Sequence, residues 1–99
     1  TQRKQKSLLR SAYAALKPGG VMVYCTCSFA PEENELVVNA LLKKSDAMLL
    51  PIANAPENSL SGLTQWMTKD LDSQLSRSLR ITPKGPWDGF YLAHIAKPQ

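Results

Sequence analysis

The sequence is poor in the residues that build metal centres and disulfide frameworks. It has two cysteines, Cys25 and Cys27, and one histidine, His94. Two cysteines separated by one residue would close a very small, strained ring if they were oxidised, so reduced thiols and an intracellular, cytoplasmic protein are expected. A structural zinc site needs four ligands, and His94 lies in the middle of an apolar run. No metal is therefore expected.

Long apolar runs and glycine-rich turns are also missing. No apolar run approaches the roughly 18 residues that indicate a membrane span, and the polar, basic opening has no signal-peptide core behind it. There is no G-x-G-x-x-G turn to hold a nucleotide cofactor. The chain begins at Thr1, within a helical pattern and without an initiator Met, so we expect an excised fragment.

Length and charge set wider limits. Ninety-nine residues with 43% hydrophobic content predict one small domain, or a piece of a larger one, with a modest core. The formal net charge of +4 is compatible with a polyanionic partner, although an excess this small also occurs in many proteins that never bind nucleic acid.

The first third of the chain predicts a helix followed by a buried strand. Residues 5–17 have helical periodicity, and Pro18-Gly19-Gly20 ends the helix. Val21 to Cys25 shows no polar alternation, so this strand is expected to lie inside a sheet and to be covered on both faces. The predicted apolar stripe of the helix consists of Leu8, Leu9, Ala12, Ala15 and Leu16.

The middle of the chain predicts a crossover unit. Pro31 suits a first helical position, and the acidic residues after it complement a helix N-terminus, so a helix is expected over Pro31 to Lys44. Residues 47–52 form a second short strand. A strand, helix and strand in this order are nearly always right-handed and parallel.

The last part of the chain is harder to interpret. Residues 53–63 indicate a loop, and Thr64 to Leu79 predict a short helix from leucines at four-residue spacing. Pro83 to Pro86 and Asp88-Gly89 are typical of turns, and Phe90 to Ile95 form a final strand.

Cys27 is the candidate nucleophile. It lies at the carboxyl end of the predicted buried strand, between Thr26 and Ser28 and just before a helix start, where backbone N–H groups and a helix dipole favour a thiolate. The competing interpretation, a small buried apolar residue, stands evenly against it on these residues alone. His94 is interpreted as a core or edge-strand residue rather than a general base.

Basic residues gather in two places and could hold a phosphate backbone beside aromatic rings that stack on bases. The alternative, a solvated charged face with the aromatic residues in the core, is the more common outcome. The first cluster consists of Arg3, Lys4, Lys6 and Arg10, and the second of Arg77, Arg80 and Lys84 with Trp87 and Tyr91.

Three segments together resemble the RNA 5-methylcytosine methyltransferases of the Nol1/Nop2/Sun type. They are Leu16 to Ser28 with its Thr-Cys-Ser motif, Pro31-Glu32-Glu33-Asn34-Glu35, and the closing stretch from Pro83 to Ala93. The resemblance implies that Cys27 attacks carbon 6 of a target cytosine in rRNA or tRNA. Electron density then reaches carbon 5, which takes a methyl group from S-adenosylmethionine.

The resemblance also implies the fold. We expect an α/β chain, with residues 1–99 forming the C-terminal half of a Rossmann-like methyltransferase fold: a three-stranded sheet with flanking helices. The family's cofactor strands, its acidic ribose-binding residue and its second, Pro-Cys cysteine would lie upstream, and Cys25 does not match that cysteine. The S-adenosylmethionine site is therefore expected upstream, and this chain alone is expected to be inactive. Glu32 and Glu33 are expected to be structural.

Two alternatives stay open. One is a non-catalytic RNA-binding module with a methyltransferase-like fold, and the other is a different Rossmann-like methyltransferase in which Thr-Cys-Ser only packs. If the chain lacks its upstream half, the strand from Val21 to Cys25 loses a neighbour, and self-association through the exposed sheet edge is expected.

Overall fold

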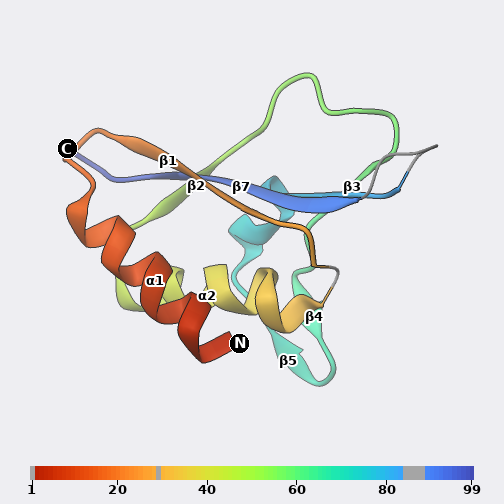
Figure 1. The fold of residues 1–99 in the computed structure, drawn as a ribbon, viewed down its shortest axis with the longest axis horizontal. Helices are drawn as coiled ribbons and strands as arrows, with labels where there is room; N and C mark the ends of the chain where they lie inside the picture. The colour runs from red at the N-terminus through yellow and green to blue at the C-terminus, as the bar shows by residue number, and fades with distance from the viewer. Residues whose placement is uncertain (1, 29, 84–88) are drawn as a thin grey trace.

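Two layers make up the protein: a five-stranded sheet, and two α-helices that pack on one of its faces (Figure 1). The computed structural model describes residues 2–28, 30–83 and 89–99. The helices are α1 (Gln2–Ala15) and α2 (Glu35–Lys44). Among the described residues, no helix combines the length and apolar character needed to cross a bilayer. The core between the layers contains Leu9, Tyr13, Val37, Val38, Leu41, Leu49, Tyr91, Ala93 and Ile95.

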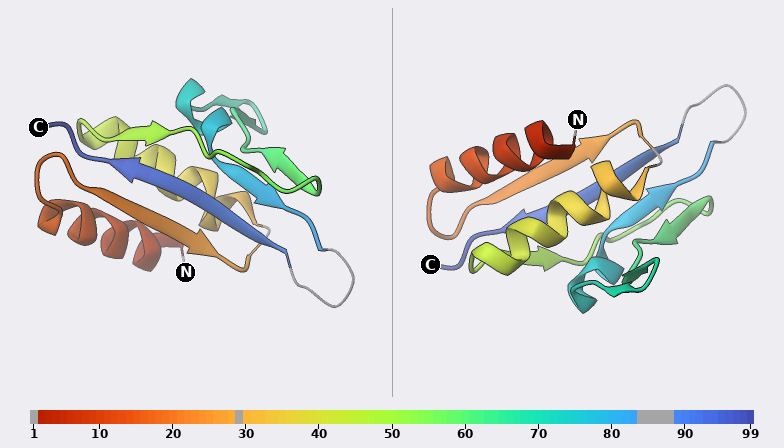
Figure 2. Two further views of the ribbon diagram at one scale, coloured as in Figure 1. Left: turned by 90° about the horizontal axis from the view of Figure 1, so that it is seen from above. Right: turned by 90° about the horizontal axis from the view of Figure 1, so that it is seen from below.

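The last strand in the sequence lies in the middle of the sheet. β7 (Phe90–Ala96) pairs with β1 (Val21–Thr26) on one side, and with β2 (Met48–Leu50) and β6 (Leu79–Ile81) on the other (Figure 2). β3 (Ser59–Ser61) extends the sheet beyond β6. All four pairings are antiparallel. Because β7 pairs directly with β1, β2 and β6, it is the central strand of the sheet.

The predicted α/β class is confirmed, and each of the three predicted strands forms. β1 and β2 run in the same direction because both are antiparallel to β7, but β7 lies between them, which the sequence did not indicate. The predicted loop at 53–63 contributes β3, and β6 is a further short strand that was not predicted.

The prediction that β1 is covered on both faces is wrong for this chain. β1 lies at an edge of the sheet, and its residues alternate between exposed and half-buried. Val21 and Val23 are 51% and 58% exposed on the face that carries no helix, whereas Met22 and Tyr24 pack against the core. The uninterrupted apolar run of β1 therefore belongs to an edge strand with one open face, and not to an interior strand.

The α1 prediction is right in position and partly wrong in its buried face. Leu9 and Tyr13 are the buried residues, while Leu8 is 64% exposed and Ala12 lies on the surface. The Tyr13 ring fills the core, and its hydroxyl donates a hydrogen bond of 2.7 Å to Asp46. This polar anchor fixes the rotation of the helix, which apolar periodicity alone did not resolve.

The second helix is two elements instead of one. Pro31–Glu33 form a 3-10 turn (η1), and α2 begins only at Glu35. Asn34 stands between them with φ −115° and ψ −96°, outside the helical region. The predicted helix therefore has the correct ends, Pro31 and Lys44, but it is interrupted at Asn34.

The helix predicted over residues 64–79 is wrong. A two-stranded hairpin, β4 (Gln65–Trp66) with β5 (Lys69–Asp70), precedes a 3-10 helix, η2 (Ser73–Arg77). Leu71 and Leu75 are buried as their spacing required, but on irregular backbone. The backbone N–H of Asp72 donates to Asn39 of α2, 33 residues earlier, and the Asp72 carboxylate accepts from the Gln74 N–H, so one long-range bond and one local cap hold this backbone out of a helix. The predicted turns at 83–86 and 88–89 fall largely outside the described residues.

Candidate active site

Cys27 follows the last residue of β1 and is exposed. Thr26, directly before it, is opposite Tyr91 in the sheet, so the strand pairing fixes the backbone up to the turn. Cys25, two residues earlier, pairs with Leu92 and is also exposed. The structure therefore places Cys27 at the carboxyl end of a strand, as the sequence predicted.

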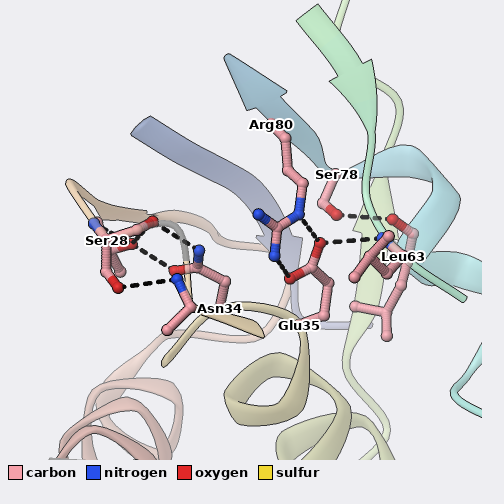
Figure 3. A network of polar contacts seen from close by, with 9 residues as sticks. Ser28, Asn34, Glu35, Leu63, Ser78 and Arg80 are labelled. Carbon is pink, nitrogen blue, oxygen red and sulfur yellow. Dashed lines mark hydrogen bonds and ion pairs between the residues drawn. The ribbon is translucent and has the colours of Figure 1, made fainter. Parts of the chain in front are cut away.

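A buried asparagine holds the turn on both sides of Cys27. Asn34 has no exposed surface, and its side-chain oxygen accepts a hydrogen bond from the Thr26 hydroxyl (Figure 3). Its Nδ2 donates to the Ser28 carbonyl at 2.7 Å. The Ser28 hydroxyl in turn accepts from the Ala30 N–H at 3.1 Å. The sequence pattern alone assigned no role to Asn34, although an amide within an acidic helix start was a visible signal.

Next to Asn34, a buried ion pair joins the start of α2 to β6. The Glu35 carboxylate is fully buried and receives Nε and Nη2 of Arg80, each at 2.5 Å. One carboxylate oxygen also accepts from the Leu63 N–H at 2.9 Å (Figure 3). These bonds tie the first turn of α2 to two distant parts of the chain. Glu33, expected to be structural, accepts the Tyr24 hydroxyl on its backbone carbonyl at 2.7 Å.

Electrostatics disfavour Cys25 as a nucleophile. Partial burial raises the pKa of the Cys25 thiol, and the neighbouring Cys27 raises it further. A raised pKa lowers the thiolate fraction of Cys25 near neutral pH. Burial, with the Glu33 charge, also raises the pKa of Tyr24, the residue before it, to about 12.

His94 lies away from the turn. It is half-buried in β7, opposite Val23 and Leu50. Val23 is four residues before Cys27, which is about 13 Å along a strand. His94 is a sheet residue, as expected, and is not placed to act as a base for Cys27. Within residues 2–28, 30–83 and 89–99, no group of three or more metal-ligating side chains comes together.

Three residues of the first basic cluster, Arg3, Lys6 and Arg10, line a groove between α1 and α2. The groove has a volume of about 610 Å³, and a hollow of about 230 Å³ adjoins it. No carboxylate appears among the described residues that line either space. We call this surface the basic groove; its cationic residues are Arg3, Lys6, Arg10, Lys43, Lys44 and Lys69.

The described residues of the second basic cluster are engaged within the fold. Arg77 donates to the Leu49 carbonyl at 2.8 Å, and Arg80 is engaged by Glu35. Tyr91 is 1% exposed, so its ring cannot stack on a base. Lys84 and Trp87 lie outside the described residues. The alternative interpretation, a solvated face with the aromatic residues in the core, is confirmed for Tyr91, whereas Arg80 belongs to a buried ion pair instead of a solvated face.

Two features of the described residues argue against an S-adenosylmethionine site beside this turn. β1 ends at Thr26 and is followed by Cys27 and Ser28, where a nucleotide site would need a glycine-rich turn. The fully buried carboxylate of Glu35 has both oxygens occupied by Arg80 and is not available to a ribose.

Known proteins share this sequence and fold. The chain is 40% identical over 98 residues to the tRNA (cytosine(49)-C(5))-methyltransferase of Pyrococcus abyssi, covering 98% of this chain and 31% of that protein. It is 60% identical over 95 residues to the ribosomal RNA small subunit methyltransferase F of Vibrio vulnificus, covering 94% and 18%. The chain thus spans less than a third of the length of these relatives.

Solved structures agree. A methyltransferase homolog protein from Pyrococcus horikoshii matches with a TM-score of 0.85 and 36% identity, over 97% of this chain and 30% of that one. NSun6 from Pyrococcus horikoshii with SFG matches with a TM-score of 0.70 and 27% identity, over 100% and 23%. The family model described as 16S rRNA methyltransferase RsmB/F matches residues 1–96. With sequence and fold in agreement, this chain belongs to the RsmB/F family of RNA methyltransferases.

Proposed function

We propose that this chain carries the nucleophile of an RNA cytosine-carbon-5 methyltransferase and that Cys27 is that nucleophile. One observation supports this most strongly. Cys27 is an exposed thiol directly after the last residue of β1, in a turn held by a buried side chain. In this proposal residues 1–99 are the C-terminal part of a Rossmann-like catalytic domain, and two free thiols fit a cytoplasmic protein.

The chemistry requires a thiol at an open position. Carbon 5 of cytosine is a poor nucleophile until something adds to carbon 6. The Cys27 thiolate forms a carbon–sulfur bond at carbon 6, and the electron pair of the 5,6 double bond moves toward carbon 5. After carbon 5 has been substituted and has lost its proton, the carbon–sulfur bond breaks and the thiolate leaves. Cys27 is exposed and so accessible to a base.

The methyl donor implied by the family is S-adenosylmethionine, and we place its site outside residues 1–99. The absence of a glycine-rich turn after β1 and the occupied Glu35 carboxylate support this placement.

RNA is the proposed partner, and the basic groove is its proposed contact on this chain. Six cations lie together there without a carboxylate among the described lining residues, so a phosphate backbone would relieve their mutual repulsion. Phosphate contacts make affinity fall with salt, with a log–log slope of about −0.7 per contact for single strands. Lys6→Ala with Lys44→Ala should reduce the slope by about one to two. An unchanged slope would contradict the assignment.

The test of the nucleophile compares the two cysteines in the complete protein. Cys27→Ala should abolish the covalent adduct with substrate RNA on a denaturing gel, and Cys25→Ala should retain it. In the unmodified protein, a small alkylating agent near neutral pH should label Cys27 faster than Cys25 when sites are mapped by mass spectrometry. An adduct that survives Cys27→Ala would refute the assignment. RNA binding without any adduct, unchanged by either substitution, would instead support a non-catalytic RNA-binding module.

A further inference from the structure

Asn34 does not make the hydrogen bond that its position predicts. An asparagine directly before an α-helix usually accepts from an N–H of the first turn, and loss of such a cap costs about 1 kcal/mol. Asn34 precedes α2 but makes no side-chain cap bond. Both polar atoms of its side chain are directed to the turn after β1 instead.

The two bonds bracket Cys27. On one side, the Asn34 oxygen accepts the Thr26 hydroxyl; on the other, Nδ2 donates to the Ser28 carbonyl at 2.7 Å (Figure 3). The Ser28 N–H donates a hydrogen bond of 3.3 Å to the Thr26 hydroxyl oxygen, so the peptide unit after Cys27 is also fixed. Cys27 is the exposed residue between two anchored neighbours.

Asn34 is itself rigidly held. Its N–H donates to the Pro31 carbonyl and its carbonyl accepts from Val38, each at 3.1 Å, and its side chain is fully buried. Glu35, the next residue, is locked by Arg80 and Leu63. The turn is therefore fastened to the start of α2, which is fixed in turn to β6.

We propose that Asn34 is a positioning residue for Cys27: its amide fixes the turn so that the thiol stands at the distance and angle needed to reach carbon 6 of a bound cytosine. This inference rests on the proposed role of Cys27 as nucleophile. Only an amide meets the requirement, because one atom must accept from Thr26 while the other donates to Ser28. An aspartate would turn an acceptor toward the Ser28 carbonyl.

The same helix offers a matched control. Asn39 lies inside α2, five residues after Asn34, is 4% exposed, and its side-chain oxygen accepts a part-buried hydrogen bond from the Asp72 N–H at 2.8 Å. It makes no hydrogen bond to the turn. Replacing Asn39 therefore reproduces the loss of a buried amide in α2 without releasing Thr26 or Ser28.

The experiment measures adduct formation in single-turnover assays of the complete protein, with RNA affinity and thermal stability measured in parallel. A nucleophile displaced by about 1 Å loses about 100-fold in rate. Asn34→Ala and Asn34→Asp should therefore slow the adduct step by about this factor and change RNA affinity less than about threefold. Asn39→Ala should lower stability but leave the adduct rate within about threefold of the unmodified protein.

Thr26 tests the same contact from the other side. Thr26→Val removes the hydroxyl and should slow the adduct step, whereas Thr26→Ser keeps it and should restore the rate; this pair carries the test if Asn34 variants do not fold. Any of three results would overturn the inference. The first is an adduct rate for Asn34→Ala near that of the unmodified protein, and the second is an equal loss of rate for Asn34→Ala and Asn39→Ala. The third is an equal rate for Thr26→Val and Thr26→Ser. An adduct that persists in Cys27→Ala refutes the nucleophile instead, so the two failures are distinguishable.

Discussion

Removing Arg80 should destabilise the chain far more than removing any ordinary surface arginine. Its guanidinium makes two charge-assisted bonds of 2.5 Å to the Glu35 carboxylate, which has no exposed surface. In Arg80→Met, that carboxylate would keep only the Leu63 N–H among these partners. Breaking a buried pair from one side costs about 3–5 kcal/mol, because an uncompensated charge is left behind. A domain this size has a total unfolding free energy of only about 5–15 kcal/mol.

The assay is urea unfolding followed by circular dichroism. With slopes of about 1–3 kcal/mol per molar urea, the midpoint for Arg80→Met should fall by about 1 M or more. The double variant Glu35→Gln with Arg80→Met should recover at least about 2 kcal/mol, because the buried charge is gone and the glutamine oxygen can still accept from Leu63. Arg77→Met, which loses one bond to a backbone carbonyl, should cost about 1 kcal/mol. A loss below about 1 kcal/mol for Arg80→Met, or strictly additive effects in the double variant, would refute this reasoning.

Three further outcomes are expected of the 99-residue chain. Burial raises the pKa of Tyr24 from its ordinary 10 to about 12, so the stability that the neutral form contributes is complete below pH 10 and is lost as pH rises through 12. Tyr24→Phe should therefore reduce the alkaline decline of the melting temperature in thermal unfolding curves. Identical curves for the two proteins would contradict this. Calorimetric titration with S-adenosylmethionine should detect no saturable binding, since two features of the described residues argue against a site for that cofactor beside the turn; micromolar affinity would show the site has been misplaced. The unpaired edge of β1 and its exposed valines should cause self-association that rises with concentration in sedimentation experiments. Val23→Lys should reduce this self-association. A strictly monomeric chain across a wide concentration range would count against a free edge.

Local patterns predicted well wherever one short-range cause was sufficient. Pro18-Gly19-Gly20 ends the first helix as expected, and Gly19 has the positive φ of 81° that favours glycine. The position of Cys27 at the end of a strand was predicted correctly because the apolar run and the turn that ends it are consecutive residues. The apolar run at 90–95 was correctly a strand, but nothing in its composition shows that it lies between β1 and β2.

Prediction failed where distant residues decide. Leucine spacing favoured a helix over 64–79, but the bond that Asn39 of α2 accepts from the Asp72 N–H holds this segment in another shape. The role of Asn34 depends on Thr26 and Ser28, six to eight residues away, and that of Arg80 on Glu35, 45 positions earlier. A list of cations could not separate Lys6, which lines an open groove, from Arg80, which is locked in a buried pair.

The central place of β7 has a consequence for the order of events during translation. β1, β2 and β6 all pair with β7, so none of these pairings can form until residues 90–96 have left the ribosome. Until then β1, which ends beside Cys27, has no ladder, and contacts of such long sequence separation are slow to form. A chain stalled a few codons before this strand can form only its helices, the β3–β6 pairing and the small β4–β5 hairpin. The turn that carries Cys27 is therefore assembled late in the synthesis of these 99 residues, because β1 receives its partner strand only then.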